Sequence, residues 1–186
     1  NKKHNIFKKY IFYPAQFWGH KNHFGLIKAI SVLKTRNIII NAIFVGSSKN
    51  THIECINMIK KYGLEQQIII LDYVSNSELV YLFKNANSLV MPTFLGPTNI
   101  PQLEDFALGC PVLTSNIYGI PEQVGDAALL FDPNSINDIA NKIEMVWNDD
   151  KLRLKLIEKG FAKDLQWNQL KFNDCLESVI SDYFVE

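Results

Sequence analysis

Residues 38–71, IIINAIFVGSSKNTHIECINMIKKYGLEQQIIIL, contain two apolar, β-branched runs separated by an amphipathic segment. The runs, at residues 38–45 and 67–71, are almost continuously apolar, as strands are when helices cover both faces of a parallel sheet. The segment between them, residues 51–62, carries apolar residues at three and four spacing and predicts a helix. The stretch therefore predicts a strand–helix–strand unit.

The same alternation continues in both directions from this unit. Four further apolar runs predict strands at residues 10–13, 88–91, 111–114 and 128–131. Three further amphipathic segments predict helices at residues 20–35, 77–85 and 100–108. The predicted fold class is α/β: a doubly wound, Rossmann-like parallel sheet of six strands with helices on both faces.

The alternation stops after residue 131, where consecutive helices are predicted instead. They cover residues 135–147, 150–163 and 168–183, and the last lies in a C-terminal helical segment, residues 168–186. Ser135 is a candidate N-cap, and Gly160 is a candidate break.

The length of 186 residues favours one domain over residues 1–186. Residues 1–5 are mostly polar and lead directly into a strand-like run, as a chain does when it is cut at an interdomain linker. We therefore expect residues 1–9 to be a linker remnant and a further N-terminal domain to be missing.

The composition narrows the classes of partner. Nineteen Lys and Arg residues balance nineteen Asp and Glu residues, so no basic field favours nucleic acid or an anionic membrane. Cys55, Cys110 and Cys175 lie far apart in apolar segments and are expected to be buried, reduced thiols of a cytoplasmic protein. No apolar run approaches the roughly 20 residues that a membrane-spanning helix needs.

Ligands of a doubly wound sheet bind beyond the carboxyl ends of its strands, so the loops there are the candidate sites. The first, residues 14–23, combines Gly19 and Lys21 at the start of a predicted helix, which makes an anion site. The alternative is that Lys21 is a solvated lysine of the first turn. His20 and His23 have metal-ligand spacing, but no third ligand is placed nearby, so a metal site is disfavoured.

The loop of residues 92–101 leads into the predicted helix that contains Glu104. Thr98 or Asn99 can cap this helix, Pro101 suits its first turn, and its free N–H groups would face a phosphate. Glu104 could accept hydrogen bonds from a ribose, or it is an ordinary carboxylate near a helix N-terminus.

The loop of residues 72–78 carries a capping-box pattern, with Ser75 followed three residues later by Glu78. Tyr73 and Val74 could form a wall for a planar base, or could serve only in packing. The sequence lacks GxGxxG after its first strand, a P-loop and a GxSxG elbow, which disfavours dehydrogenases, P-loop hydrolases and α/β-hydrolases. A receiver-like signalling module would need acidic residues after the first strand, where Pro14, Ala15 and Gln16 stand instead.

Three segments carry a family resemblance: YPAQFW with HKNH at residues 13–23, LE with ALGCPV at residues 103–112, and PEQVGDAALLFDP at residues 121–133. In this order and spacing the chain resembles the C-terminal domain of glycosyltransferase family 4. This is a large group of retaining enzymes with the two-domain GT-B architecture. The similarity extends from about residue 10 to residue 167.

The resemblance implies a site for a nucleotide-diphosphate sugar such as a UDP- or GDP-sugar, with no cofactor or metal required. It places Lys21 on the diphosphate as the catalytic, electrostatic group and Glu104 on the ribose. The remaining donor-binding positions implied are Gln16, Gly46, Tyr73, Val74, Thr98, Asn99, Ile100 and Pro101.

Two positions depart from the family pattern. Many members have an arginine where Gln16 stands and a first glutamate where Gly96 stands. We favour a subfamily whose sugar contacts are altered and involve Thr98 or Asn99. A different donor sugar and an impaired site are the alternatives.

The implied function is retaining transfer of a hexosyl group to a glycan or lipid-linked acceptor, which the missing domain would bind. By analogy with family members, it would serve bacterial capsule or lipopolysaccharide synthesis in the cytoplasm, at or near the inner face of the membrane. The alternatives are a degenerate domain that only binds a sugar nucleotide or a partner, and a sugar-nucleotide epimerase of the same architecture.

Overall fold

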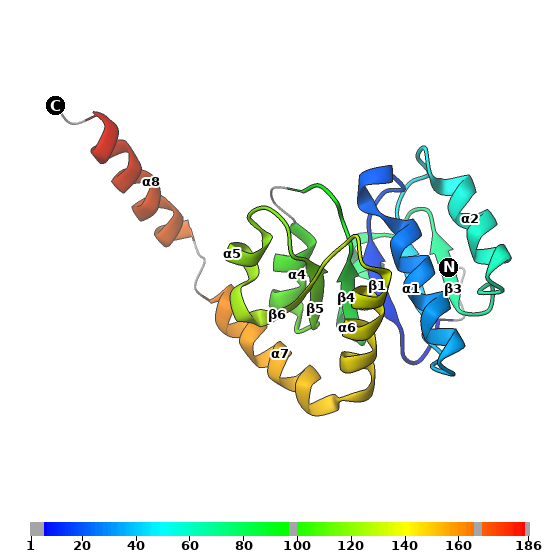
Figure 1. Ribbon diagram of the computed structural model, residues 1–186. Helices are drawn as coiled ribbons and strands as arrows, with labels where there is room; N and C mark the ends of the chain where they lie inside the picture. The colour runs from blue at the N-terminus through cyan, green and yellow to red at the C-terminus, as the bar shows by residue number, and fades with distance from the viewer. Residues whose placement is uncertain (1–5, 97–99, 166–168, 185–186) are drawn as a thin grey trace.

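The computed structural model describes residues 6–96, 100–165 and 169–184. Its centre is one parallel sheet with the strand order β3-β2-β1-β4-β5-β6 (Figure 1). The strands are β1 (Ile11–Pro14), β2 (Ala42–Val45), β3 (Ile68–Leu71), β4 (Ser88–Met91), β5 (Val112–Ser115) and β6 (Ala128–Phe131). The six-stranded doubly wound sheet predicted from the sequence is confirmed.

Helices connect the strands and follow the last of them. The longer ones are α1 (His23–Thr35), α2 (His52–Lys61), α3 (Asn76–Asn85), α4 (Ile100–Leu108), α6 (Ile136–Asn148), α7 (Asp150–Asp164) and α8 (Gln169–Phe184). Three short elements were not predicted: the 3-10 turns η1 (Gly19–Lys21) and η2 (Gly125–Ala127) and the helix α5 (Ile120–Val124). No described helix is both long and apolar enough to cross a membrane.

The sheet is buried because its strands are apolar on both faces. Helix α1 packs against α2 and α6 (Figure 1). Helix α4 packs against α3 and α7. Phe12 of β1 is fully buried and meets Phe83 of α3 edge to face, with 5.0 Å between ring centroids. Each such ring buries a large apolar area, which favours folding.

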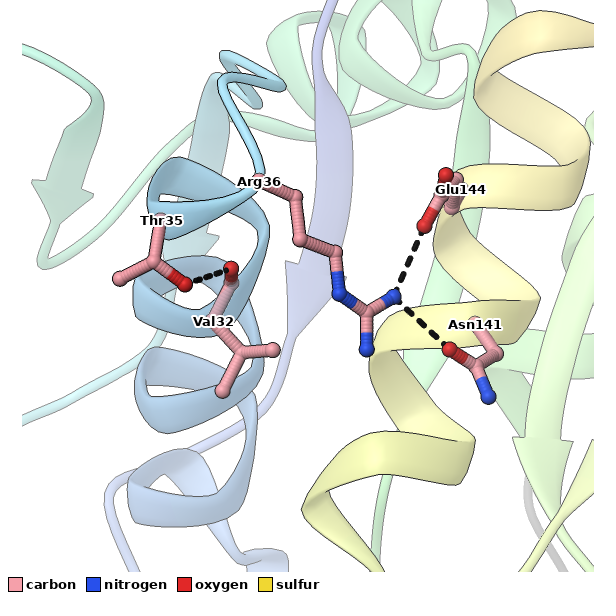
Figure 2. Close-up of polar contacts among 5 residues, drawn as sticks. All are labelled: Val32, Thr35, Arg36, Asn141 and Glu144. Atoms are coloured by element: carbon pink, nitrogen blue, oxygen red, sulfur yellow. Dashed lines mark hydrogen bonds and ion pairs between the residues drawn. The ribbon is translucent and has the colours of Figure 1, made fainter.

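A polar contact ties α1 to the helix that follows the last strand. Arg36, just after α1, donates from Nη1 to Asn141 Oδ1 and to Glu144 Oε2 of α6, each at 2.8 Å (Figure 2). Because both charged side chains are about one-third exposed, the pair adds little stability to the packing of α1 against α6.

Two predicted helix starts are confirmed by their capping hydrogen bonds. Ser75 accepts the Glu78 N–H and Glu78 accepts the Ser75 N–H, so the predicted capping box is present. Ser135 accepts the Asp138 N–H at 3.2 Å and is the predicted N-cap of α6.

Two predicted elements begin three or four residues later than expected. The helix predicted from residue 20 begins at His23, because Asn22 has a left-handed backbone (φ 54°) that ends η1 first. The strand predicted from residue 38 begins at Ala42, which pairs with Ile11, the first residue of β1. Residues 36–38 instead close α1: the Ile38 N–H bonds to the Leu33 carbonyl around a left-handed Asn37.

Two further predictions need correction. Gly160 does not break its helix, since α7 continues through it, and its lack of a side chain admits Phe106, which an added Cβ would meet at 2.9 Å. Cys55 and Cys110 are buried as expected, but Cys175 is exposed on α8. Figure 1 shows why: α8 lies away from the packed sheet and helices. The predicted start of that helix at residue 168 lies outside the described residues.

Candidate nucleotide site

The order of the strands in the sheet indicates which end of the molecule holds the candidate site. Strands β1 and β4 are neighbours although the chain visits β2 and β3 between them, so the strand order reverses there. The loops that leave β1 and β4 therefore diverge at their carboxyl ends and leave room for a ligand. The loop of residues 14–23 follows β1, and α4 follows β4.

The loop after β1 is held firmly where it carries Lys21. The Tyr13 hydroxyl donates to the Lys21 carbonyl at 2.7 Å. The His20 carbonyl accepts the Phe94 N–H at 2.7 Å and the Thr93 hydroxyl at 3.1 Å. Contacts from two different strand ends thus fix the backbone around Lys21.

Asn22 completes this anchoring, a role that the sequence reading missed. Its side-chain oxygen caps α1 by accepting the Gly25 N–H at 3.0 Å, and its amide donates to the Pro133 carbonyl at 3.0 Å. The residue is buried. The sequence signal for this role was an asparagine at the position just before the helix, since Asn is a favoured N-cap residue.

The two histidines of the loop have different surroundings. His23 is buried in an aromatic cluster, stacked on Phe17 at 4.3 Å and close to Tyr13 at 4.8 Å between ring centroids. Burial lowers its pKa to about 3. His20 is exposed, and among the described residues no group of three His, Cys, Asp or Glu could hold a metal ion.

Gly46 allows the loops after β1 and β2 to touch. A Cβ on Gly46 would lie 2.2 Å from the Ala15 carbonyl oxygen and 2.8 Å from the Gln16 nitrogen. The family resemblance implies that this glycine lets the backbone approach a donor, and the structure shows that it lets the Ala15 backbone approach. A hydrogen bond from the Phe17 N–H to the Ser47 carbonyl, at 3.3 Å, also joins these two loops.

A cavity of about 450 Å³ opens between the ends of β1 and β4 and the start of α4. Lys21 is its cationic group, beside the exposed His20, and Ile100 and Pro101 form the wall from α4. Burial lowers the pKa of Lys21, whose side chain is half-buried. No hydrogen bond or ion pair to Lys21 Nζ is made by any residue of the described ranges. An unpaired, partly desolvated ammonium is suited to an anion.

A second cavity, of about 630 Å³, opens at the ends of β1, β2 and β3. Its lining includes Gly46, Tyr73 and Val74, which the sequence reading had singled out, and also Asp72, which it had not. Pro14, Ala15 and Gln16 line both cavities, so the two adjoin along the loop after β1.

Gln16 has a fixed orientation at this junction. Its side-chain oxygen accepts the Trp18 indole N–H at 2.9 Å, which leaves its amide N–H donors for another partner. Lys49, from the loop after β2, lies over the Trp18 ring at 5.4 Å from the centroid.

Not all the predicted positions gather at these cavities. Gln16, Lys21, Gly46, Tyr73, Val74, Ile100 and Pro101 do line them. Glu104 is exposed on α4, one turn beyond Ile100, and lines neither cavity. Thr98 and Asn99, with their predicted capping role, lie outside the described residues.

Helix α4 carries two buried polar residues that were not predicted, and one of them bonds to the sheet. Gln102, fully buried, donates its amide to the Thr114 hydroxyl of β5. Asp105 is also fully buried, and burial raises its pKa well above the ordinary value. The Gln102–Thr114 bond therefore ties to β5 the helix whose first turn walls the Lys21 cavity.

Comparison with known proteins identifies the family to which the chain belongs. The model of the family "Glycosyl transferases group 1" matches residues 1–163. The chain is 29% identical over 175 residues to O-antigen chain mannosyltransferase B of Escherichia coli, covering 94% of this chain and 45% of that protein. It is 24% identical to the capsular polysaccharide biosynthesis glycosyltransferase CapM of Staphylococcus aureus, covering 78% of this chain and 40% of CapM.

Among solved structures, the fold is similar to that of Anabaena Alr3699/HepE in complex with UDP and glucose. The TM-score is 0.79 at 17% identity, over 94% of this chain and 49% of that one. The chain thus spans about half the length of these relatives. Since the family model covers most of its residues, the chain belongs to the glycosyl transferases group 1 family.

Proposed function

We propose that this chain is the donor-binding, C-terminal domain of a retaining hexosyltransferase of glycosyltransferase family 4. In this proposal a nucleotide-diphosphate sugar lies along the two adjoining cavities. The observation that carries it is the unpaired, half-buried Lys21 in a cavity at the point where strand order reverses. Membership in the group 1 family and the UDP and glucose bound by Alr3699/HepE support it.

The role proposed for Lys21 is electrostatic stabilisation of the leaving diphosphate. In a retaining transfer the bond from the anomeric carbon to the diphosphate oxygen breaks as negative charge develops on the diphosphate. A fixed cation at that oxygen lowers the barrier, because it needs no reorganisation during the reaction. The hydrogen bonds that hold the Tyr13–Lys21 loop keep the Lys21 backbone in place for this role.

The other donor contacts are proposed from position for the residues that line the cavities, and from the family resemblance for the rest. Tyr73 and Val74 would border the base, and Gln16 would present its amide N–H groups to the phosphates at the junction of the cavities. Ile100 and Pro101, which line the Lys21 cavity, would lie near phosphate and sugar. The family resemblance assigns Thr98 and Asn99 to the same contacts and Glu104 to the ribose. We propose that the acceptor binds to a further domain, since the relatives are about twice as long. The names of the E. coli and S. aureus relatives favour a role in surface polysaccharide synthesis.

A degenerate, binding-only domain is the second candidate. Gln16 and Gly96 replace an arginine and a glutamate that the resemblance leads one to expect, and Gln16 removes one positive charge from the phosphate end. The two candidates share the donor site and differ in turnover. They separate when a protein of the relatives' full length is assayed for transfer of a labelled sugar.

Calorimetric titration with GDP and UDP tests the donor site. At least one of them should bind saturably, and Lys21→Ala should weaken that binding about 10- to 100-fold, because a charge-assisted contact to phosphate contributes about 1.5–3 kcal/mol. The matched control is Lys28→Ala, which removes an exposed lysine from α1 and should change nothing. Equal affinities for the Lys21→Ala and Lys28→Ala variants would show that the ammonium does not contact the ligand.

A further inference from the structure

Asp72 lines the larger cavity, and its carboxylate has no partner among the described residues. It directly follows β3, is exposed, and lines the cavity with Tyr73 and Val74. Within the described ranges, no hydrogen bond or ion pair engages the Asp72 carboxylate. It is also the one charged side chain among the lining residues of that cavity that the structure describes. A carboxylate so placed needs hydrogen-bond donors from whatever occupies the cavity.

The two cavities together carry opposite charges at their two ends. Lys21 stands at the β4 side and Asp72 at the β3 side, and the shared wall of Pro14, Ala15 and Gln16 runs between them. A nucleoside diphosphate would place its phosphates at Lys21, because Asp72 repels them. The base would then lie at Asp72, and the carboxylate would select among bases by the donors that they offer.

Guanine is the common base whose donors match a carboxylate. Its N1–H and its 2-amino group lie side by side on one edge and can donate to both carboxylate oxygens. Uracil offers a single N3–H between two carbonyl oxygens, which would face the carboxylate unfavourably. In adenine and cytosine the amino group lies next to a ring nitrogen that is an acceptor. The other bases therefore leave the carboxylate with one donor or with a repelling lone pair.

We propose that Asp72 makes this site selective for guanine nucleotides. The inference rests on the proposed donor site and adds the identity of its base. The cavity volume of about 630 Å³ lies within the range of small-molecule sites and accommodates a bicyclic base. The half-buried Val74 and Leu79 supply apolar walls, and the exposed Tyr73 supplies a ring at the rim.

The test compares GDP, inosine diphosphate and UDP, because inosine diphosphate differs from GDP only by the missing 2-amino group. The chain should bind GDP about 10- to 100-fold more tightly than either of the others. Asp72→Ala should lower GDP affinity by a similar factor and make GDP and inosine diphosphate bind alike. The matched control, Glu65→Ala, removes an exposed carboxylate from the turn before β3 and should preserve the GDP preference.

Several outcomes would overturn the inference, and they separate it from the donor site itself. If Asp72→Ala weakens all three nucleotides equally, the carboxylate contacts a shared part such as the ribose. If it changes none of them while Lys21→Ala weakens all, the donor site stands and base selection lies elsewhere. Absence of saturable binding by the folded chain to any of the three would contradict both proposals.

Discussion

Replacing Gly46 with alanine is expected to lower the free energy of unfolding by about 1–3 kcal/mol and to abolish nucleoside diphosphate binding. The added Cβ would fall 2.2 Å from the Ala15 carbonyl oxygen, far inside van der Waals contact. The clashing atoms belong to the backbone and not to a flexible side-chain end, so the loop after β1 must move. That loop forms the wall shared by both cavities.

Urea unfolding and titration with GDP and UDP measure the two effects. Gly19→Ala is the matched control, because its Cβ would meet only Thr51 Cγ2 at an ordinary 3.9 Å, in the same loop. This control should stay within about 0.5 kcal/mol of the unchanged chain and should bind normally. A Gly46→Ala variant that unfolds and binds like Gly19→Ala would show that the two loops do not meet as described.

His23 should make the fold sensitive to acid. Its ring nitrogens lack hydrogen bonds of ordinary geometry, the nearby Ala15 backbone offsets only part of the burial, and the folded-state pKa falls from 6.5 to about 3. The unfolded chain therefore takes up a proton first as the pH falls. The stability that neutral His23 provides is complete above pH 6.5 and is lost between pH 6.5 and about pH 3.

Replacing His23 with phenylalanine should remove this loss, since the site is already lined by Phe17, Tyr13 and Phe44. Between about pH 7.5 and about pH 4.5, the unchanged chain should lose about 2–3 kcal/mol more than His23→Phe. Denaturant unfolding at both pH values measures the difference. The control is His20→Gln, at an exposed imidazole of the same loop, which should keep the acid sensitivity. Parallel pH curves for the unchanged chain and His23→Phe would mean that His23 titrates normally.

The sheet was predictable because each of its strands lies within an apolar run of the sequence. The residue pairs Ala42–Ile68 and Leu89–Val112 lie within runs that the sequence had marked as strands. Local backbone conformations were less accessible. Nothing in the composition of residues 20–35 indicates that Asn22 adopts a left-handed backbone and splits the segment into η1 and α1.

The candidate site was predictable where one loop carries it and less so where the sheet assembles it. Lys21 and Gln16 belong to the loop after β1, and family resemblance marked both. Asp72 belongs to the loop after β3, a strand that β2 separates from β1 in the order β3-β2-β1, so only the assembled sheet brings this loop to the same edge as the loop after β1. In the sequence it looked like part of the capping region before Ser75. Its proposed role depends on the neighbouring cavity and on the absence of a partner among the described residues. Neither feature can be predicted from the residues next to Asp72 in the sequence.

The most direct test of the central claim is a map of amide chemical shifts for the isotope-labelled chain titrated with GDP and, separately, with UDP. The account predicts shifts concentrated in the loops that line the two cavities, around Gln16, Lys21, Gly46 and Tyr73, with α6 and α7 unaffected. Shifts concentrated elsewhere, or none at saturating nucleotide, would contradict a donor site at the carboxyl ends of the strands.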